Sequence, residues 1–339
     1  MRQRVLSGMR PTGPLHLGHL VGALKNWVDL QEKYDCFFMV ADWHALMSEY
    51  EKPGETEERT KAMVADWIAA GIDPEQSTIF RQSDVRQHLE LYMVLSIIAP
   101  LGWVERVPTY KEQLREVKGR DLATYGFLGY PVLQAADILL YKANAVPVGE
   151  DQIPHLELTR EIVRRFKFLY NSDIFPEPKP LLTQESRLMG SDGRKMSKSY
   201  DNFIALSEEP ESIRKKVQKM VTDTKRIKMT DPGHPEECNT CHYWEVFAPE
   251  EKQRVWEECR TSKRGCTQNK QELAEKIVSL TERFRSVREE ARMRGTMAGH
   301  SGNIDEILAR GADKARTVAE ETMHEVWKAV GIPKEIRRG

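Results

Sequence analysis

The sequence QRVLSGMRPTGPLHLGHLVGALKNWVDLQEKYDCFFMVAD, residues 3–42, decides the fold. Residues 3–7 read as a short strand, and a loop rich in Gly and Pro follows at 8–14. Over 16–34 the apolar residues recur at helical spacing. Residues 36–42 then form a near-continuous apolar run, which is typical of a strand buried on both faces. The stretch therefore predicts a strand, a helix and a second strand in succession.

The same alternation continues along the chain. A helix is predicted at 56–71, a strand at 77–83 and a further strand ending in a polar turn at 144–152. This order predicts an α/β fold, with a parallel sheet covered by helices on both sides. Ligands bind such sheets beyond the carboxyl ends of the strands, so we expect residues 8–13 and 42–44 to face one crevice.

The pattern changes near residues 190–205. Residues 171–202 are rich in Pro, Gly, Ser and Asp and predict a mobile connection, and beyond Ser207 the pattern is almost wholly helical. We therefore divide the chain into four parts. These are a sheet-bearing domain at 1–190, a loop at 191–202, a helical domain at 203–310, and a closing helix at 311–339 that packs back on the body.

Composition excludes several classes of protein. The chain has 339 residues and a mean hydropathy of −0.57, and no apolar run approaches the ~20 residues of a membrane span. The N-terminus lacks the apolar run of a secretory signal, so we expect a cytoplasmic protein without a membrane partner. The net charge of −1 argues against nucleic-acid binding by bulk charge. Residues 211–230 nevertheless carry seven basic and two acidic side chains.

The segment PLHLGHL at 14–20 places His16 and His19 on either side of Gly18, at the start of the first helix. A helix N-terminus attracts anions, and both imidazoles can donate hydrogen bonds to phosphate oxygens. Gly18 would let a base or ribose approach the backbone closely. Two exposed histidines or a chelated metal are the plainer interpretations of this pattern.

The segment GSDGRKMSKSYDN at 190–202 holds Lys195, Lys198 and two serine hydroxyls in a loop bounded by glycine. Flexible lysines can follow a phosphate whose charge shifts during a reaction. By composition alone, a basic and solvated linker is the favoured interpretation of this segment.

Together the two motifs resemble the class I aminoacyl-tRNA synthetases. GMRPTGPLHLGHLVGAL at 8–24, ADWHAL at 41–46, YPVLQAADILLY at 130–141, VPVGEDQIPHLELTREI at 146–162 and KMSKS at 195–199 are similar to the bacterial tryptophanyl-tRNA synthetases. The resemblance implies a Rossmann-like, doubly wound parallel sheet as the catalytic domain. It also implies that residues 203–310 form an all-helical anticodon-recognition domain.

The resemblance further implies a two-step reaction. L-Tryptophan and ATP give tryptophanyl-adenylate and pyrophosphate, and tryptophan then passes to the 3′ end of tRNA(Trp). Mg²⁺ would accompany ATP, and the protein would be a homodimer, for which the apolar helix around 87–104 is a plausible interface.

Site residues are carried over from the family by matching motifs. The catalytic set would be His16, His19, Lys195 and Lys198. The ATP-binding set would be Arg10, Gly18, His19, Gly149, Asp151, Gln152, Met196, Ser197 and Lys198. The tryptophan-binding set would be Leu6, His44, Tyr130, Gln134, Asp137, Val146 and Val148, with Asp137 accepting the indole N–H.

Other functions stay open at this point. Gln134 stands where many bacterial members have Met and is reminiscent of tyrosine-selecting pockets, so a tyrosine–tRNA ligase is an alternative. A small-molecule nucleotidyltransferase would also use H-x-G-H, although it would not need KMSKS. A non-catalytic RNA-binding or redox-sensing paralogue conflicts with the intact His16, His19, Lys195 and Lys198.

Four of the five cysteines lie close together in the sequence: Cys238, Cys241, Cys259 and Cys266. Four thiolates suit a [4Fe–4S] cluster and Zn²⁺ alike. A subset of tryptophanyl-tRNA synthetases with a [4Fe–4S] cluster looks similar here, although its spacing differs, and the cluster is the favoured prediction. Cys36 lies in the apolar strand and is predicted to be part of the core.

Overall fold

The protein is described by a computed structural model that covers residues 2–51, 53–116, 122–182, 188–294 and 302–332. Its sheet has five strands, all parallel, in the order β3-β2-β1-β4-β5. The strands are β1 (Arg4–Met9), β2 (Asp35–Val40), β3 (Thr78–Arg81), β4 (Ala145–Val148) and β5 (Lys179–Leu182). The predicted α/β fold with a Rossmann-like, doubly wound sheet is confirmed.

Side chains on β2 alternate between two separate hydrophobic cores. Cys36 and Phe38 pack with the helices on one face of the sheet, and Phe37 and Met39 pack with the helices on the other. The period of two explains why the run reads as continuously apolar, since both faces are buried. Cys36 is fully buried, as predicted.

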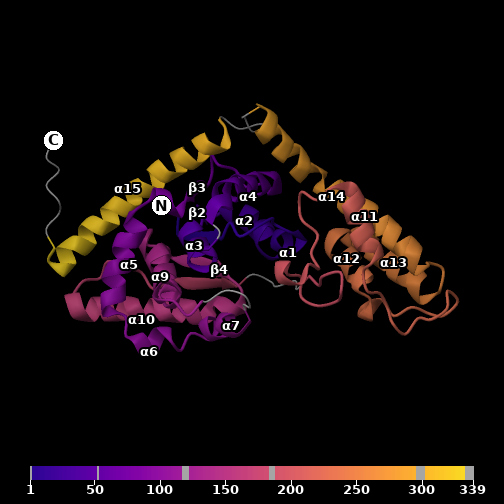
Figure 1. Ribbon diagram of the computed structural model, residues 1–339, viewed down its shortest axis with the longest axis horizontal. Coiled ribbons are helices and arrows are strands. Elements are labelled where there is room, and N and C mark those ends of the chain that lie inside the picture. The colour runs from indigo at the N-terminus through magenta and orange to yellow at the C-terminus, as the bar shows by residue number, and fades with distance from the viewer. Residues whose placement is uncertain (1, 52, 117–121, 183–187, 295–301, 333–339) are drawn as a thin grey trace.

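Helices cover both faces (Figure 1). On one face of the sheet the first core takes its helical residues from α1 (Leu17–His19), the π-helix η1 (Leu20–Leu24), α2 (Lys25–Gln31) and α4 (Thr56–Ala70), and it extends into the helices that follow residue 209. The second takes them mainly from α5 (Gln87–Ile98), α9 (Tyr130–Leu140), α10 (Ile153–Tyr170) and α15 (Ile304–Val330). Shorter helices complete this part: α3 (Asp42–Glu49), α6 (Leu101–Val104), α7 (Pro108–Glu116) and α8 (Tyr125–Leu128).

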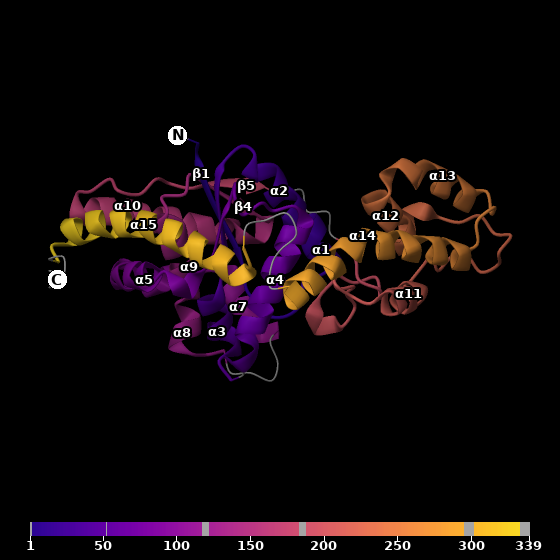
Figure 2. The same cartoon turned by 90° about the horizontal axis from the view of Figure 1, so that it is seen from above.

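The helical part stands beside the sheet as a separate lobe (Figure 2). It consists of α11 (Pro210–Gln218), α12 (Asn239–Phe247), α13 (Pro249–Arg260) and α14 (Cys266–Arg294). The long α14 returns to the sheet-bearing part, where the Arg288 guanidinium donates to both carboxylate oxygens of the buried Asp66 on α4, at 2.8 and 2.6 Å. A bidentate pair of this kind fixes the angle at which α14 meets α4.

Several elements differ from the sequence-based prediction. The strand β5 lies in the segment 171–202, which was predicted to be a mobile connection. The apolar helix expected around 87–104 is two helices, because Pro100 ends α5 and begins α6. The last helix begins at Ile304, where Asn303 and Glu306 form a capping box, and not near residue 312. None of the helices in the described ranges is both long enough and apolar enough to cross a membrane.

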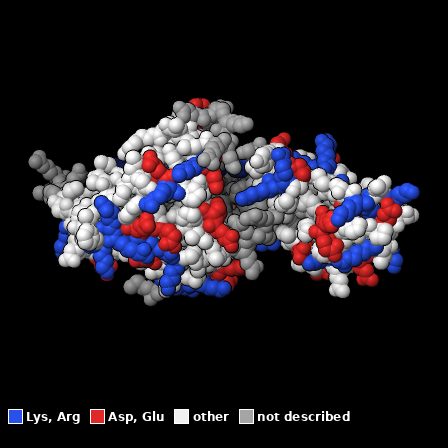
Figure 3. Space-filling view, turned by 90° about the horizontal axis from the view of Figure 1, so that it is seen from below, with Lys and Arg blue, Asp and Glu red and all other residues white. Residues whose placement is uncertain are grey.

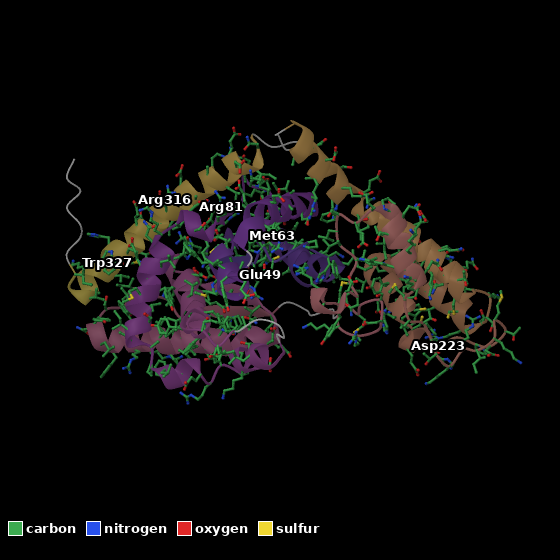
Figure 4. All side chains as sticks on the ribbon, viewed as in Figure 1. Glu49, Met63, Arg81, Asp223, Arg316 and Trp327 are labelled. Atoms are coloured by element: carbon green, nitrogen blue, oxygen red, sulfur yellow. The ribbon has the colours of Figure 1, made fainter. Side chains whose placement is uncertain are left out.

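The helix α15 lies against β3, an edge strand of the sheet (Figure 1). Arg81 at the end of β3 and Arg316 on α15 both donate to Asp84, Arg81 to the carboxylate at 3.0 Å and Arg316 to the backbone carbonyl at 3.1 Å (Figure 4). At Gly311 the helix meets the strand so closely that a Cβ would lie 1.8 Å from the carbonyl oxygen of Ile79. Only glycine permits this approach.

We predict that Gly311→Ala separates α15 from β3. The methyl group has no space, so the substitution should lower the free energy of unfolding by about 3 kcal/mol, the upper range for an overpacked site. A thermal melt followed by circular dichroism measures the effect. Gly102→Ala is the matched control, because a Cβ there meets no atom within 4 Å. Equal melting temperatures for the two variants would contradict the prediction.

Candidate active site

Two adjoining cavities open beyond the carboxyl ends of the strands, and both are lined by His19, Gly22 and Ala23. The larger measures about 610 Å³ and the smaller about 430 Å³. Predicted residues that line the larger are Leu6, Arg10, His19, His44, Tyr130, Gln134, Asp137, Val146, Val148, Gly149, Asp151 and Gln152. Predicted residues that line the smaller are His16, Gly18, His19, Lys195, Met196, Ser197 and Lys198.

The two histidines cap the first turn of α1. The Nδ1 atom of His16 accepts from the backbone N–H of Gly18 at 3.2 Å, and Nδ1 of His19 accepts from the backbone N–H of His16 at 3.1 Å. This is a capping box built from imidazoles in place of the usual hydroxyl and carboxylate. Because both Nδ1 atoms accept, each ring must carry its proton on Nε2 when neutral.

Both imidazoles are held in the neutral form. Burial, followed by the charge of Lys198, lowers the pKa of His16 to about 4. Burial, His16 and Lys198 hold the pKa of His19 well below its ordinary value. At neutral pH each ring therefore offers one Nε2–H donor and no charge. The structure therefore identifies the Nε2–H group of each ring as the donor that could contact phosphate.

The loop that carries KMSKS is fastened from behind by Asn202, which sequence reasoning did not single out. Its side-chain oxygen accepts from the backbone N–H of Ser197 at 2.8 Å, and its Nδ2 donates to Asp192 at 2.7 Å and to the carbonyl of Lys195 at 3.1 Å. Asn202 is buried, and Met196 is buried as well. Lys195, in contrast, is exposed. The loop is therefore anchored through its backbone while the exposed lysine keeps its side-chain freedom.

Lys198 lies over the start of the first helix, with its Nζ near Gly13. Burial, together with the nearby Arg10, lowers the pKa of Lys198 to about 8. A phosphate bound beside Lys198 would stabilise its charged form, because the negative charge compensates for the hydration that the ammonium group loses on burial.

A buried hydrogen-bond network converges on Asp137 of α9. His44 donates from Nε2 to Oδ2 at 2.8 Å, while His88 from Nδ1 and Gln82 from Nε2 both donate to Oδ1 at 2.7 Å. Burial alone would raise the pKa of Asp137, but the hydrogen bonds from His44 and His88 outweigh it, so the net pKa lies below the ordinary value. The carboxylate is therefore ionised although it is buried.

A second network lies behind Tyr130. Its hydroxyl is 2.9 Å from the Thr109 hydroxyl, which in turn is 2.5 Å from Nε2 of His155. Sequence reasoning missed His88, Gln82, Thr109 and His155. The only available signal for His155 was its position three residues after the predicted Gln152, one turn into α10.

The four cysteines do not converge as predicted. Cys238, Cys241 and Cys259 form one buried cluster, but Cys266 is half-buried at the first turn of α14 and lies outside it. The α14 side chain that reaches the thiols is Asn269, whose Nδ2 is 3.7 Å from Sγ of Cys241. Among the described residues no group of three or more His, Cys, Asp or Glu is arranged to hold a metal ion. The arrangement therefore gives no support to the predicted site with four thiolate ligands.

Comparison with known proteins agrees with this geometry. The family described as tRNA synthetases class I (W and Y) matches residues 1–282. A tryptophan–tRNA ligase of Thermotoga maritima is 48% identical over 336 residues, which are 97% of this chain and 99% of the relative. A tryptophan–tRNA ligase of Ralstonia nicotianae is 41% identical over 97% of this chain and 98% of the relative. The chain belongs to the tryptophan–tRNA ligases of class I.

Structural comparison extends this result. The crystal structure of tryptophanyl-tRNA synthetase from Campylobacter jejuni complexed with ADP and tryptophan superposes with a TM-score of 0.87 at 33% identity, over 97% of this chain and 100% of that one. A tyrosyl-tRNA synthetase of Archaeoglobus fulgidus superposes with a TM-score of 0.64 at 20% identity, which shows the shared fold. Both of the curated relatives named above are tryptophan–tRNA ligases, although Gln134 lines the cavity of this chain.

We predict an alkaline limb in the ATP dependence of this tryptophan–tRNA ligase. The charge of Lys198 is present below pH 8 and is lost as the pH rises through its pKa of about 8. kcat/KM for ATP, which reports the free enzyme, should therefore fall above that pH. In Lys198→Arg the fall should disappear, because a guanidinium stays charged. Steady-state pyrophosphate exchange between pH 6.5 and 9.5 measures both profiles.

Lys195→Arg is the matched control for this experiment. Lys195 is exposed, so its replacement should leave the alkaline limb in place. A limb that persists in Lys198→Arg would show that another group produces it.

Proposed function

We propose that the two adjoining cavities bind tryptophan and ATP side by side, and that the chain joins them to tryptophanyl-adenylate before transfer to tRNA(Trp). The observation that carries the proposal is that His19 lines both cavities, so the α-phosphate of ATP in one can meet the carboxylate of tryptophan in the other. The carboxylate attacks this phosphorus, and pyrophosphate leaves. No covalent bond to the protein is needed.

The chain stabilises charge and does not act as a nucleophile. His16 and His19 cap the first turn of α1 through their Nδ1 atoms, so each offers a neutral Nε2–H donor to phosphate oxygens. Lys195 and Lys198 face the side on which negative charge develops as pyrophosphate leaves. ATP and Mg²⁺ are expected for this class of enzyme, and the metal would arrive with ATP and help to neutralise the charge on its phosphates, beside Lys195 and Lys198.

Tryptophan lies in the larger cavity in this proposal. Val146 and Val148 of β4 and Leu6 of β1 give the cavity apolar walls. Asp137 is ionised, and it accepts the indole N–H, which is a donor only. Tyr130 contacts the amino acid's ammonium group, and Gly149, Asp151 and Gln152 contact the ribose and the reacting groups.

The partners of the chain are tRNA(Trp) and a second copy of itself. Met93 and Ile97 are 60% and 69% exposed and lie four residues apart on α5, so they form one apolar stripe. Leu101, at the start of the next helix α6, is 58% exposed as well. A homodimer would cover this stripe, because an exposed apolar patch is a usual protein–protein interface. We place the dimer interface there.

The helical lobe, α11 to α14, would recognise the anticodon, which is the role predicted for residues 203–310. Its charge is more evenly mixed than the sequence suggests, because Arg214, Lys216 and Lys225 each pair with a glutamate. Figure 3 shows positive and negative side chains side by side over this lobe. Support for tRNA binding therefore comes from the family and not from a bare cationic face. The catalytic role of residues 1–190, the mobile role of loop 191–202 and the cytoplasmic location also stay predictions.

We predict pyrophosphate exchange with tryptophan and roughly 10⁴-fold less with tyrosine, because a site built to bond an N–H rejects an analogue that lacks it. Asp137→Ala should raise the tryptophan KM steeply. Exchange assays with each amino acid and labelled pyrophosphate measure both effects. Exchange with tyrosine at the tryptophan rate would favour the tyrosine–tRNA ligase instead.

The [4Fe–4S] cluster implied by the sequence resemblance stays a hypothesis with less support, and so does the alternative Zn²⁺, because Cys266 lies apart from the other three thiols. Metal analysis of protein purified without oxygen tests it. About four irons per chain that are lost in Cys259→Ser, together with weaker tRNA charging and intact exchange, would establish the cluster. Wild-type protein that holds neither iron nor zinc would end the hypothesis.

A further inference from the structure

The buried network around Asp137 continues one step beyond the tryptophan cavity. His88 lies on α5 and is fully buried, and it does not line the cavity. Its Nδ1 is 2.7 Å from Oδ1 of Asp137, and its Nε2 is 2.7 Å from the hydroxyl of Tyr141, which is also fully buried. Three side chains from two packed helices and the turn after α9 therefore form a linear chain, Tyr141–His88–Asp137.

The acceptor positions of Asp137 can be counted. An ionised carboxylate has about four lone-pair positions, two on each oxygen. Among the described contacts, His88 and Gln82 take both positions on Oδ1, and His44 takes one on Oδ2. One position is left on Oδ2, the oxygen bonded to the cavity-lining His44. The indole of tryptophan offers one N–H, so the number of donors matches the number of acceptor positions.

Tyr141 determines which nitrogen of His88 carries the proton, and so whether His88 donates to the Asp137 carboxylate. Burial and the nearby Asp137 raise the pKa of Tyr141 well above its ordinary value, so the hydroxyl keeps its proton and can donate it to Nε2. An imidazole that accepts at Nε2 carries its proton on Nδ1, where it faces Asp137. Without the tyrosine hydroxyl, the proton could sit on Nε2 and leave a lone pair opposite the carboxylate.

We propose that His88 and Tyr141 are positioning residues for tryptophan selection, which orient Asp137 so that a single acceptor position on Oδ2 is left for the indole N–H. The inference rests on the proposed function, because it assumes that Asp137 receives the indole. Neither residue touches the substrate in this arrangement. Both act through the carboxylate, so their removal should cost recognition of the N–H and not the rate of the chemical step.

The test uses two substrates in pyrophosphate exchange with the full chain. One is tryptophan, and the other is its benzothiophene analogue, in which sulfur replaces the N–H. His88→Leu removes the donor at nearly constant volume, and kcat/KM for tryptophan should fall roughly 10- to 100-fold, mainly through KM. For the analogue the same substitution should change kcat/KM by less than about twofold, because no N–H needs the oriented oxygen.

Two further variants keep the test sharp if His88→Leu folds poorly. His88→Asn places an N–H donor near the original Nδ1 and should recover most of the tryptophan activity. Tyr141→Phe removes a single hydroxyl and should lower kcat/KM for tryptophan by roughly 3- to 10-fold, again without effect on the analogue. Thr281→Val is the matched control, since it removes a buried hydroxyl bonded within α14 and should leave both substrates unchanged.

The outcomes separate clearly. Equal losses for both substrates would show that His88 and Tyr141 only support the fold, and unchanged tryptophan kinetics in His88→Leu would overturn the proposal outright. If the wild-type chain does not exchange with tryptophan at all, the proposed function fails first, and that result is visible without any variant.

Discussion

The first turn of the helix after β1 has backbone N–H groups that need acceptors, and two of them bond to the Nδ1 atoms of the buried His16 and the partly buried His19. That choice has consequences for the whole site. Because both Nδ1 atoms are used, the Nε2–H groups are the donors available to a ligand, and burial keeps the rings uncharged. The positive charge at this helix start is therefore supplied by Lys198, which reaches it from a loop about 180 residues later in the sequence. Because the two histidines cap the helix, they can act only as neutral donors, and the positive charge has to come from lysine.

Much of the sheet could be predicted, because a strand buried on both faces needs apolar residues at successive positions, as in the run 36–42. The strand β5 could not be predicted in the same way. It has the sequence KPLL at the edge of the sheet, where its side chains are partly exposed, so it has neither the length nor the apolar character of an inner strand. Pairing with β4 alone gives it strand geometry, and that contact is not local.

The site shows the same division between local and non-local information. His16, His19, Lys195 and Lys198 lie in short motifs, so the sequence alone singles them out as candidates, and the structure brings them to one cavity. His88 was not singled out, because a histidine in an apolar helix has no local pattern that distinguishes a bonded residue from a packed one. The prediction that four cysteines bind one metal site lacks support in the structure for a related reason. Their spacing indicated four ligands, but spacing does not say which side of α14 faces α12, and in the structure Asn269 occupies that side.

The contact between α15 and β3 determines when, during synthesis, the exposed edge of β3 is covered against pairing with other chains. The strand β3 is complete early in synthesis, and its outer edge presents unpaired N–H and C=O groups that any other extended chain could bond. The helix that lies against this strand comes from the last tenth of the sequence, with Gly311 pressed onto Ile79. A nascent or shortened chain that ends before Ile304 therefore carries an open sheet edge. In this protein, the β3 edge of the sheet is covered only when the final helix has been made.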